Sequence, residues 1–398
     1  RIGGHSHTVD VPSAVGPVAV DTGFIVYNEV TYPNLTRLFA HLGVETEPSD
    51  MSFSYSDGQG FEYASHLRGM LAQPGNLLRR RFVRMLADIN RFRREGASLD
   101  PDPGTSIEDL LIELGYSHGF VDDYLMPMTG AIWSASRNDI GRYPARSILR
   151  FLANHGLIAI VGRPRWRTVS GGSRRYVDRL VAGFRSRVRT GTPVVAVDRS
   201  KDGVTVHTPD GPERFDELVL AVHSDQALRI LGQDATDAER THLAGVRYQP
   251  NRAVLHSDSE LMPRRRAAWA SWNAARSQRS ERPVAVTYWM NRLQNLKTRE
   301  PLFVTLNPQR EPHPALVRAE FAYAHPQFDA RSGDAQLGIA ELQGERRTWY
   351  AGAWLGYGFH EDGLQSGLDV AAALGSPAPW SGGIDRASSA PVPAAVAA

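Results

Sequence analysis

The sequence contains no cysteine. Disulfide bonds, thiolate nucleophiles and cysteine-ligated metals are therefore excluded. No apolar run reaches the ~18 residues that a membrane-spanning helix needs, and no signal peptide is visible. These absences lead us to expect a cytoplasmic protein.

Excess charge and lysine are also scarce. The net charge is +2, which gives no indication of nucleic-acid binding, and Lys201 and Lys297 are the only lysines. Seven arginines crowd residues 79–94, inside a stretch whose apolar spacing predicts a helix over 75–94. A solvated basic face is the favoured interpretation, and peripheral contact with an anionic membrane is the alternative.

Chain length and apolar content set the scale of the fold. The 398 residues are 42% hydrophobic, which suits two to three domain-sized units with a real core. The pattern predicts a helix over 33–42 that ends at Gly43. It also predicts a hairpin within 51–63, centred on an Asp-Gly turn. Thr105 to Glu108 reads as a capping box at the start of another helix.

The second half of the chain is richer in strands. Strands are predicted over 192–197, 204–208 and 215–222, followed by a β-rich block over 252–323. The segment 215–222 includes a continuous apolar run, so we expect a strand buried on both faces. The end of the chain, residues 377–398, is rich in Pro, Ala and Ser and is predicted to be a disordered tail.

Glycines punctuate the stretch 348–374, which reads as a buried strand, a turn and a helix. Such a turn brings free N–H groups and the positive end of a helix dipole to a ligand. An ordinary strand-to-helix connection fits the same pattern, so this stretch alone leaves both readings open. Two further glycine pairs, Gly3-Gly4 and Gly171-Gly172, have similar physics, because each could bring backbone against one extended ligand.

These three glycine sites, in this order and with strand 215–222 between them, resemble the flavin-containing amine oxidase superfamily, which includes protoporphyrinogen oxidase and phytoene desaturase relatives. A closer similarity is to FAD-dependent proteins associated with cyclopropane-fatty-acid synthases. The strings that carry it are 3–8, 21–28, 131–134, 154–157, 255–258, 269–273 and 356–363.

The resemblance implies an α/β (α+β) fold with a Rossmann-like FAD-binding domain and an interleaved helical and β-sheet substrate domain. The FAD-binding domain would comprise 1–50, 164–235 and 345–376, and the substrate domain 51–163 and 236–344. The superfamily begins with a Gly-x-Gly-x-x-Gly turn in a βαβ unit of roughly 30 residues, which this sequence lacks. We therefore expect an N-terminally truncated sequence.

The resemblance also implies which residues bind FAD. They are Arg1, Gly3, Gly4, His5, Thr22, Gly23, Phe24, Gly171, Gly172, Val194, Val195, Gly352, Ala353, Gly358, Phe359, Glu361, Asp362, Gly363 and Leu364. Gly363 and Leu364 are expected beside flavin N1 and the C2 carbonyl, and Val194 and Val195 beside the adenine. The carboxylates of Glu361 and Asp362 are expected to cap backbone N–H groups or to point away.

Other candidates are weaker. His223 ends the strand 215–222, either near the cofactor or simply as a satisfied strand-end residue. The remaining histidines are not spaced as a metal site, so no metal is expected. An apolar pocket could be built from Tyr27, Trp133, Trp166, Trp272, Tyr288, Trp289 and Tyr357, although each also suits an ordinary aromatic core. No residue is identified as catalytic, and the lysine that many amine oxidases place near flavin N5 has no counterpart here.

The resulting hypothesis is an FAD-dependent oxidoreductase that acts on an apolar small-molecule or lipid substrate by hydride transfer to flavin N5. The alternative is a non-catalytic flavin-fold scaffold, or a lipid-delivery partner of a cyclopropane-fatty-acid synthase. Such a synthase is an expected partner on the first hypothesis as well.

Overall fold

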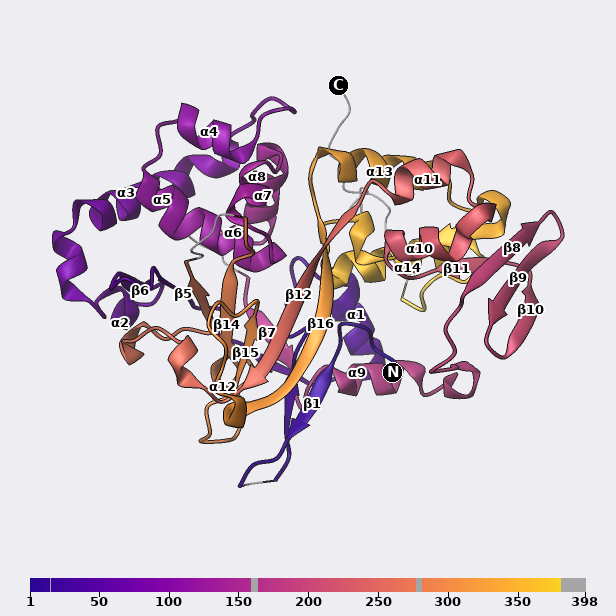
Figure 1. The fold of residues 1–398 in the computed structure, drawn as a ribbon, viewed down its shortest axis with the longest axis horizontal. Helices are drawn as coiled ribbons and strands as arrows, with labels where there is room; N and C mark the ends of the chain where they lie inside the picture. The colour runs from indigo at the N-terminus through magenta and orange to yellow at the C-terminus, as the bar shows by residue number, and fades with distance from the viewer. Residues whose placement is uncertain (15, 159–163, 277–280, 381–398) are drawn as a thin grey trace.

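The computed structural model describes residues 1–14, 16–158, 164–276 and 281–380. In this part of the chain two lobes lie on either side of the long strands β12 (Arg247–His256) and β16 (Val317–Gln327), as Figure 1 shows. Most of the predicted tail, from residue 381, lies outside the described residues, as do 159–163. No described helix is both long and apolar enough to cross a membrane.

A seven-stranded sheet is the framework of the first lobe. In spatial order its strands are β16, β12, β15 (Phe303–Leu306), β14 (Ala285–Trp289), β13 (Trp272–Ala275), β5 (Phe53–Ser56) and β6 (Glu62–Ala64). Neighbours are antiparallel except for the parallel pair β13 and β5. The hairpin predicted within 51–63 and the β-rich block are thereby confirmed.

Helices supply the other layer of this lobe. They are α2 (Leu67–Met70), α3 (Arg80–Glu95), α4 (Ile107–Glu113), α5 (His118–Phe120), α6 (Met126–Trp133), α7 (Arg137–Gly141) and α8 (Ala145–Asn154), with α12 (Met290–Leu293) after β14. Apolar side chains such as Phe82, Ile148 and Leu152 form one core with Leu255 and Val286 of the sheet.

Two helices of this lobe, α4 and α3, correspond to sequence predictions. Helix α4 is capped by Ser106, whose Oγ accepts from Asp109 N at 3.1 Å, so the capping box from Thr105 to Glu108 was misplaced by one residue. Thr105 is instead tied to the start of α8, because its carbonyl accepts from Ala145 N. The arginine-rich helix is present as α3, and Arg81 pairs with the buried Asp123 at 2.5 Å.

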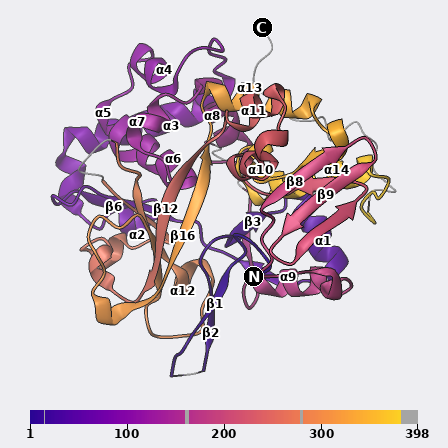
Figure 2. The same ribbon diagram turned by 45° about the vertical axis from the view of Figure 1, so that its right-hand side comes forward.

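The second lobe contains a parallel pair of strands, β11 (Leu218–Leu220) and β17 (Thr348–Tyr350), surrounded by helices. The helices are α10 (Ser224–Leu231), α11 (Asp237–Leu243), α13 (Ala330–Glu341) and α14 (His360–Ala373). An antiparallel sheet of β8 (Ala196–Ser200), β9 (Gly203–Thr208) and β10 (Gly211–Phe215) lies beside them, in front of α14 in Figure 2.

The prediction of a doubly buried strand over 215–222 is wrong. The segment divides into the end of β10 and the short strand β11, and Val219 remains 41% exposed. The exposure of Val219 and the burial of Leu220 show that only one face of β11 is covered, and among the described residues β11 pairs with β17 alone. Leu220 points the other way, into the core with Tyr350 and Trp354.

A buried ion pair fastens the antiparallel sheet to the parallel pair. The Arg199 guanidinium is buried and pairs with Asp234 at 2.5 Å and with Glu239 at 2.6 Å. Tyr350 of β17 donates to the same Glu239 carboxylate at 2.7 Å. Because its partners come from β17, α11 and the segment before α11, this network fixes how the elements of the lobe pack.

A third small sheet and two helices complete the structure. The sheet has the order β3 (Val26–Asn28), β7 (Trp166–Val169), β4 (Thr46–Pro48), and α1 (Pro33–Leu42) and α9 (Arg174–Val181) pack against it. Helix α1 ends at Gly43 in the left-handed conformation, as predicted. The hairpin of β1 (Thr8–Val11) and β2 (Val18–Asp21) projects from the molecule in both views (Figures 1 and 2).

Candidate functional site

The site forms at the carboxyl edge of β11 and β17, where open parallel sheets bind their ligands. His223 follows β11 and caps α10, while Gly352 follows β17. The indole of Trp354 connects the segments that follow the two strands, because its Nε1 donates to Val222 O at 3.0 Å. Gly352 N donates to Ser366 Oγ at 2.9 Å, which ties the same turn to α14.

The turn from Gly352 to α14 is folded around one carboxylate. Asp362 accepts from the amides of Tyr357 and Phe359 at 3.1 and 2.8 Å. Burial raises the pKa of Asp362 to about 7, while these two hydrogen bonds oppose the rise. A side chain at Gly356 would meet Asp362 at 2.5 Å, so this turn requires its glycine.

Glu361 has a similar role toward a neighbouring helix. Its carboxylate accepts from Asn34 N at 2.8 Å and from Leu35 N at 3.0 Å. These amides belong to the first turn of α1, whose N–H groups have no partner within the helix. Both acidic side chains therefore cap backbone N–H groups, as expected.

The N-terminal segment is held against residues 22–24. Thr22 N donates to His7 O and Phe24 N to His5 O, both at 2.8 Å. A Cβ atom at Gly23 would stand 2.1 Å from His5 O, which only glycine avoids. The five predicted site residues Gly3, Gly4, His5, Gly23 and Phe24 are thus brought together.

Asp21 fastens the middle glycine pair to this segment. Its buried carboxylate accepts from Ser173 N, Ser173 Oγ, Thr8 Oγ1 and Gln294 Nε2 at distances between 2.5 and 3.0 Å. Burial raises its pKa to about 6 against the pull of those donors. A Cβ on Gly172 would lie 2.6 Å from Thr8 Cγ2, so the turn passes very close to β1.

A hydrogen-bonded relay connects the first and last glycine segments. Tyr176 OH lies 2.5 Å from both Ser6 Oγ and His360 Nε2. The ring of His360 also stacks on Phe24 with centroids 4.0 Å apart. Burial lowers the pKa of His360 to about 4, so it is neutral near pH 7. The three glycine segments, far apart in sequence, therefore meet at one place.

Residues of β16 also reach this place, and sequence reasoning missed them. The ring of His5 lies 5.0 Å from that of Tyr323 and 5.5 Å from that of His325. Tyr323 and His325 share one face of β16 because strand side chains alternate. That alternation was visible in the sequence, but which face would meet His5 depends on how the chain folds.

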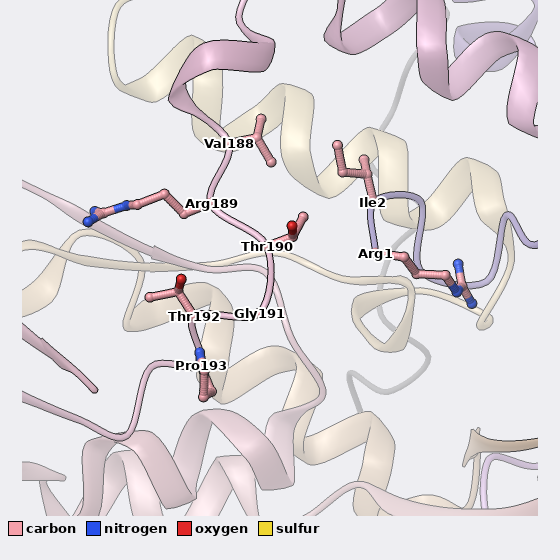
Figure 3. A pocket seen from close by; sticks show the side chains of 8 residues that line it. All are labelled: Arg1, Ile2, Val188, Arg189, Thr190, Gly191, Thr192 and Pro193. Atoms are coloured by element: carbon pink, nitrogen blue, oxygen red, sulfur yellow. The ribbon is translucent and has the colours of Figure 1, made fainter. Parts of the chain in front are cut away.

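Val194 and Val195 lie apart from these contacts, before β8, and are 36% and 59% exposed. An open pocket of about 440 Å³ separates residues 188–193 from Arg1 and Ile2. Figure 3 shows Ile2 and Thr190 facing each other across it, while the Arg189 side chain points away. Arg1 and the segment that precedes the two valines therefore line the same pocket.

The fold is that of FAD-binding amine oxidases. Over 94% of this chain, the structure is similar to a fatty acid isomerase from P. acnes that produces CLA (TM-score 0.64, 15% identity, 90% of that chain). It is also similar to cyclohexylamine oxidase from Brevibacterium oxydans IH-35A (0.62, 15%, 94% and 91%). Putrescine oxidase bound to putrescine is a third similar structure (0.62, 12%, 94% and 91%).

The sequence profile described as flavin containing amine oxidoreductase matches residues 1–254. The chain belongs to this family, and is an FAD-dependent oxidoreductase. No curated protein matches the sequence significantly.

The residues at the site fit a bound FAD. His5 Nε2 is buried and has no hydrogen-bond partner. A Cβ at Gly4 would meet nothing within 4 Å, whereas one at Gly363 would be in ordinary contact with Ala353 N at 3.5 Å. An unsatisfied buried nitrogen and open space beside Gly4 are features that a flat polar ligand would complete.

Proposed function

We propose that this oxidoreductase acts on an apolar substrate, a lipid, and removes a hydride from it to N5 of FAD. The flavin chemistry belongs to the cofactor, which when bound would accept the hydride and, with it, two electrons. The protein must hold cofactor and substrate together and keep water away. The observation that carries the proposal is the meeting of the three glycine segments beside a cluster of aromatic side chains.

This aromatic cluster adjoins the first turn of α14. Phe359 stacks on Phe151 with centroids 4.9 Å apart and an angle of 16°, and Trp133 lies 4.5 Å from Phe151. Trp133 Nε1 donates to Tyr357 O at 3.2 Å, and Trp133 and Phe151 are both buried. A hydrocarbon substrate suits a site beside such a cluster, because the cluster offers few polar partners.

We assign FAD to the cofactor-binding residues inferred from the sequence. Gly4 leaves room for a flat ring, and the first turn of α14 directs N–H groups outward. The amide of Gly363 already donates to Phe359 O at 3.1 Å. The helix dipole favours the negative charge that arrives with two electrons.

Arg1, Val194 and Val195 are assigned to the other end of the same cofactor. They adjoin the pocket between residues 1–2 and 188–193. We also propose discontinuous domains, with 1–50, 164–235 and 345–376 for FAD and 51–163 and 236–344 for substrate, and α11 and α13 of the second range pack against the FAD-binding lobe. The non-catalytic alternative is not favoured, because the family consists of oxidoreductases.

The test is anaerobic reduction of the flavin in the purified protein. Reconstituted protein should be yellow, and bleaching by phospholipids or free fatty acids, with no bleaching by putrescine or cyclohexylamine, would support a lipid substrate. Bleaching by the amines alone would contradict the lipid assignment. A protein that cannot be reconstituted with FAD would contradict the whole proposal. Co-purification with a cyclopropane-fatty-acid synthase tests the proposed partner separately.

A further inference from the structure

Four histidines from separate parts of the chain gather at this site, and we refer to them as the imidazole cluster: His5, His223, His325 and His360. The His5 ring lies 5.5 Å from His325 and 6.4 Å from His223. His360 is joined to the His5 segment through Ser6 and Tyr176. The cluster therefore combines the N-terminal segment, the carboxyl end of β11, β16 and the start of α14.

The hydrogen bonds of the cluster leave one nitrogen free to act. Asn251 Nδ2 donates to His325 Nδ1 at 3.1 Å, and Ser134 Oγ lies 3.0 Å from the same atom. Nδ1 is thus an acceptor, so in the neutral ring Nε2 carries the proton. His5 differs, because its Nε2 is buried with no partner.

The groups that face the cluster are mostly neutral or positive. Arg1 acts on His5 and His7, and Arg229 acts on His223. Of the carboxylates, Asp225 lies 4.0 Å from His223 Nδ1, and Asp21 acts on the facing Tyr176 and Tyr323. The facing tyrosines are Tyr176, Tyr248 and Tyr323, whose pKa values are all raised, so they stay neutral near pH 7.

Burial and mutual repulsion keep the cluster uncharged. The pKa values of His5 and His360 are lowered to about 4, and that of His325 to about 3, chiefly by burial. Neighbouring histidines lower the pKa further in each case. A negative charge within about 4–6 Å raises the pKa of such a group by about 1–3 units. A neutral cluster of this kind is a latent proton acceptor for any ligand that gains negative charge.

We propose that the imidazole cluster, through His5 Nε2, takes up one proton from solvent when the bound FAD is reduced by two electrons. The inference rests on the proposed FAD site. The electrons come from the reductant, substrate or dithionite, and the cofactor becomes more negative. The extra proton bonds to His5 and offsets that charge, and it returns to solvent on reoxidation. His325 and His223 are positioning residues that hold His5 and set how readily it protonates.

The first test is potentiometry of the holoprotein with dithionite, across about pH 5 to 8. The midpoint potential of the wild type should fall more steeply with pH than that of His5→Gln, by about one additional proton per two electrons over part of the range. His207→Gln, which alters a histidine on β9 that pairs with Asp198, is the matched control and should retain the wild-type slope. Equal slopes for wild type and His5→Gln would overturn the inference.

The second test observes the histidine rings directly. If His5→Gln does not retain FAD, this test by itself decides whether the inference holds. Protein with ¹³C-labelled histidine is compared by NMR without FAD, with oxidised FAD and with reduced FAD. A His5 signal that becomes protonated only on reduction supports the inference. If His5 is already protonated when oxidised FAD binds, the proton responds to the FAD phosphates and not to reduction, and the inference is overturned. The absence of any protonation would overturn it as well. A wild-type protein that binds no FAD would contradict the proposed function as well, whereas a flavoprotein without proton uptake contradicts only this inference.

Discussion

Glu361, in the first turn of α14, caps α1 by accepting from Asn34 N at 2.8 Å. The bond joins two helices more than three hundred positions apart in the chain, and Leu35 N and Asn34 Nδ2 add further bonds to the same carboxylate. The helix start that is proposed to face the flavin is thereby held by α1. Its acidic side chain is drawn away from the place where negative charge would arrive.

Glu361→Ala should destabilise the protein by about 1–2 kcal/mol, because the first amides of α1 lose their cap. Glu361→Gln keeps an acceptor and should lose less. The measurement is the urea unfolding midpoint of each variant, with Glu341→Ala on the surface of α13 as control. An Ala variant as stable as the control would show that water replaces the cap without loss.

Gly23→Ala should destabilise the protein by about 1–3 kcal/mol, the range found for overpacked sites. The added Cβ would stand 2.1 Å from His5 O, and backbone cannot yield as a side chain can. Because the shift would displace His5, retained FAD should also fall. Thermal unfolding and flavin absorbance measure the two effects. A variant that keeps both wild-type values would show that residues 5 and 23 separate easily.

Gly363→Phe should lose flavin, because its Cβ position already contacts Ala353 N at 3.5 Å and a ring there would enter the turn to which the cofactor is assigned. Gly367→Phe, one turn later on α14, is the matched control, because nothing lies within 4 Å of that Cβ position. Far-UV circular dichroism checks the fold and absorbance near 450 nm checks the flavin. Equal flavin content in both variants would show that the ring lies elsewhere.

Stability should fall as the pH drops from about 6.5 to 4. The pKa values of His5, His155, His256 and His360 are lowered to about 4, chiefly by burial. The unfolded chain binds protons at the ordinary value of 6.5, so in this window it binds more protons than the folded chain. The stability that these uncharged rings contribute is therefore complete above pH 6.5 and is lost as the pH falls toward 4. Urea midpoints of the FAD-free protein measure it, and His155→Phe should flatten the profile. The buried Asp21 and Asp362 oppose this trend, because their pKa values are raised to about 6 and 7 and the folded chain binds their protons first. The difference between wild type and His155→Phe therefore isolates the histidine contribution, and an unchanged profile in that variant would contradict the burial of its ring.

The sequence predicts local structure here better than it predicts which faces meet. Helix α1 could be predicted because Pro33 and Gly43 mark its two ends by backbone chemistry alone. The doubly buried strand at 215–222 could not be judged, because an apolar run does not reveal whether other elements cover both faces of its strand. Tyr323 and His325 were missed for the same reason. Their place beside His5 depends on the register of β16 with β12, a contact between distant segments.

Asp21 should be the most sensitive of the buried carboxylates at the site. It is 0% exposed, and its oxygens accept from Thr8, Ser173 and Gln294. Asp21→Asn replaces one acceptor oxygen with an NH₂ group, which is a donor and faces the donors that the carboxylate now satisfies. Each buried group left without a hydrogen-bond partner costs about 1–3 kcal/mol. We therefore expect a loss of about 2–4 kcal/mol in the free energy of unfolding.

The matched control for Asp21→Asn is Asp10→Asn, which breaks the exposed pair with Arg174 and should cost less than about 1 kcal/mol. Urea unfolding gives both values. Flavin retention should fall only in Asp21→Asn, because Asp21 holds the Gly171-Gly172 turn against β1 through Ser173 N. If flavin retention and stability were both unchanged by the Asn substitution, the conformation of the turn would depend on its two glycines and not on Asp21. The three segments would then meet without this carboxylate, and the link between the middle glycine pair and the N-terminal segment would rest on packing at Thr8.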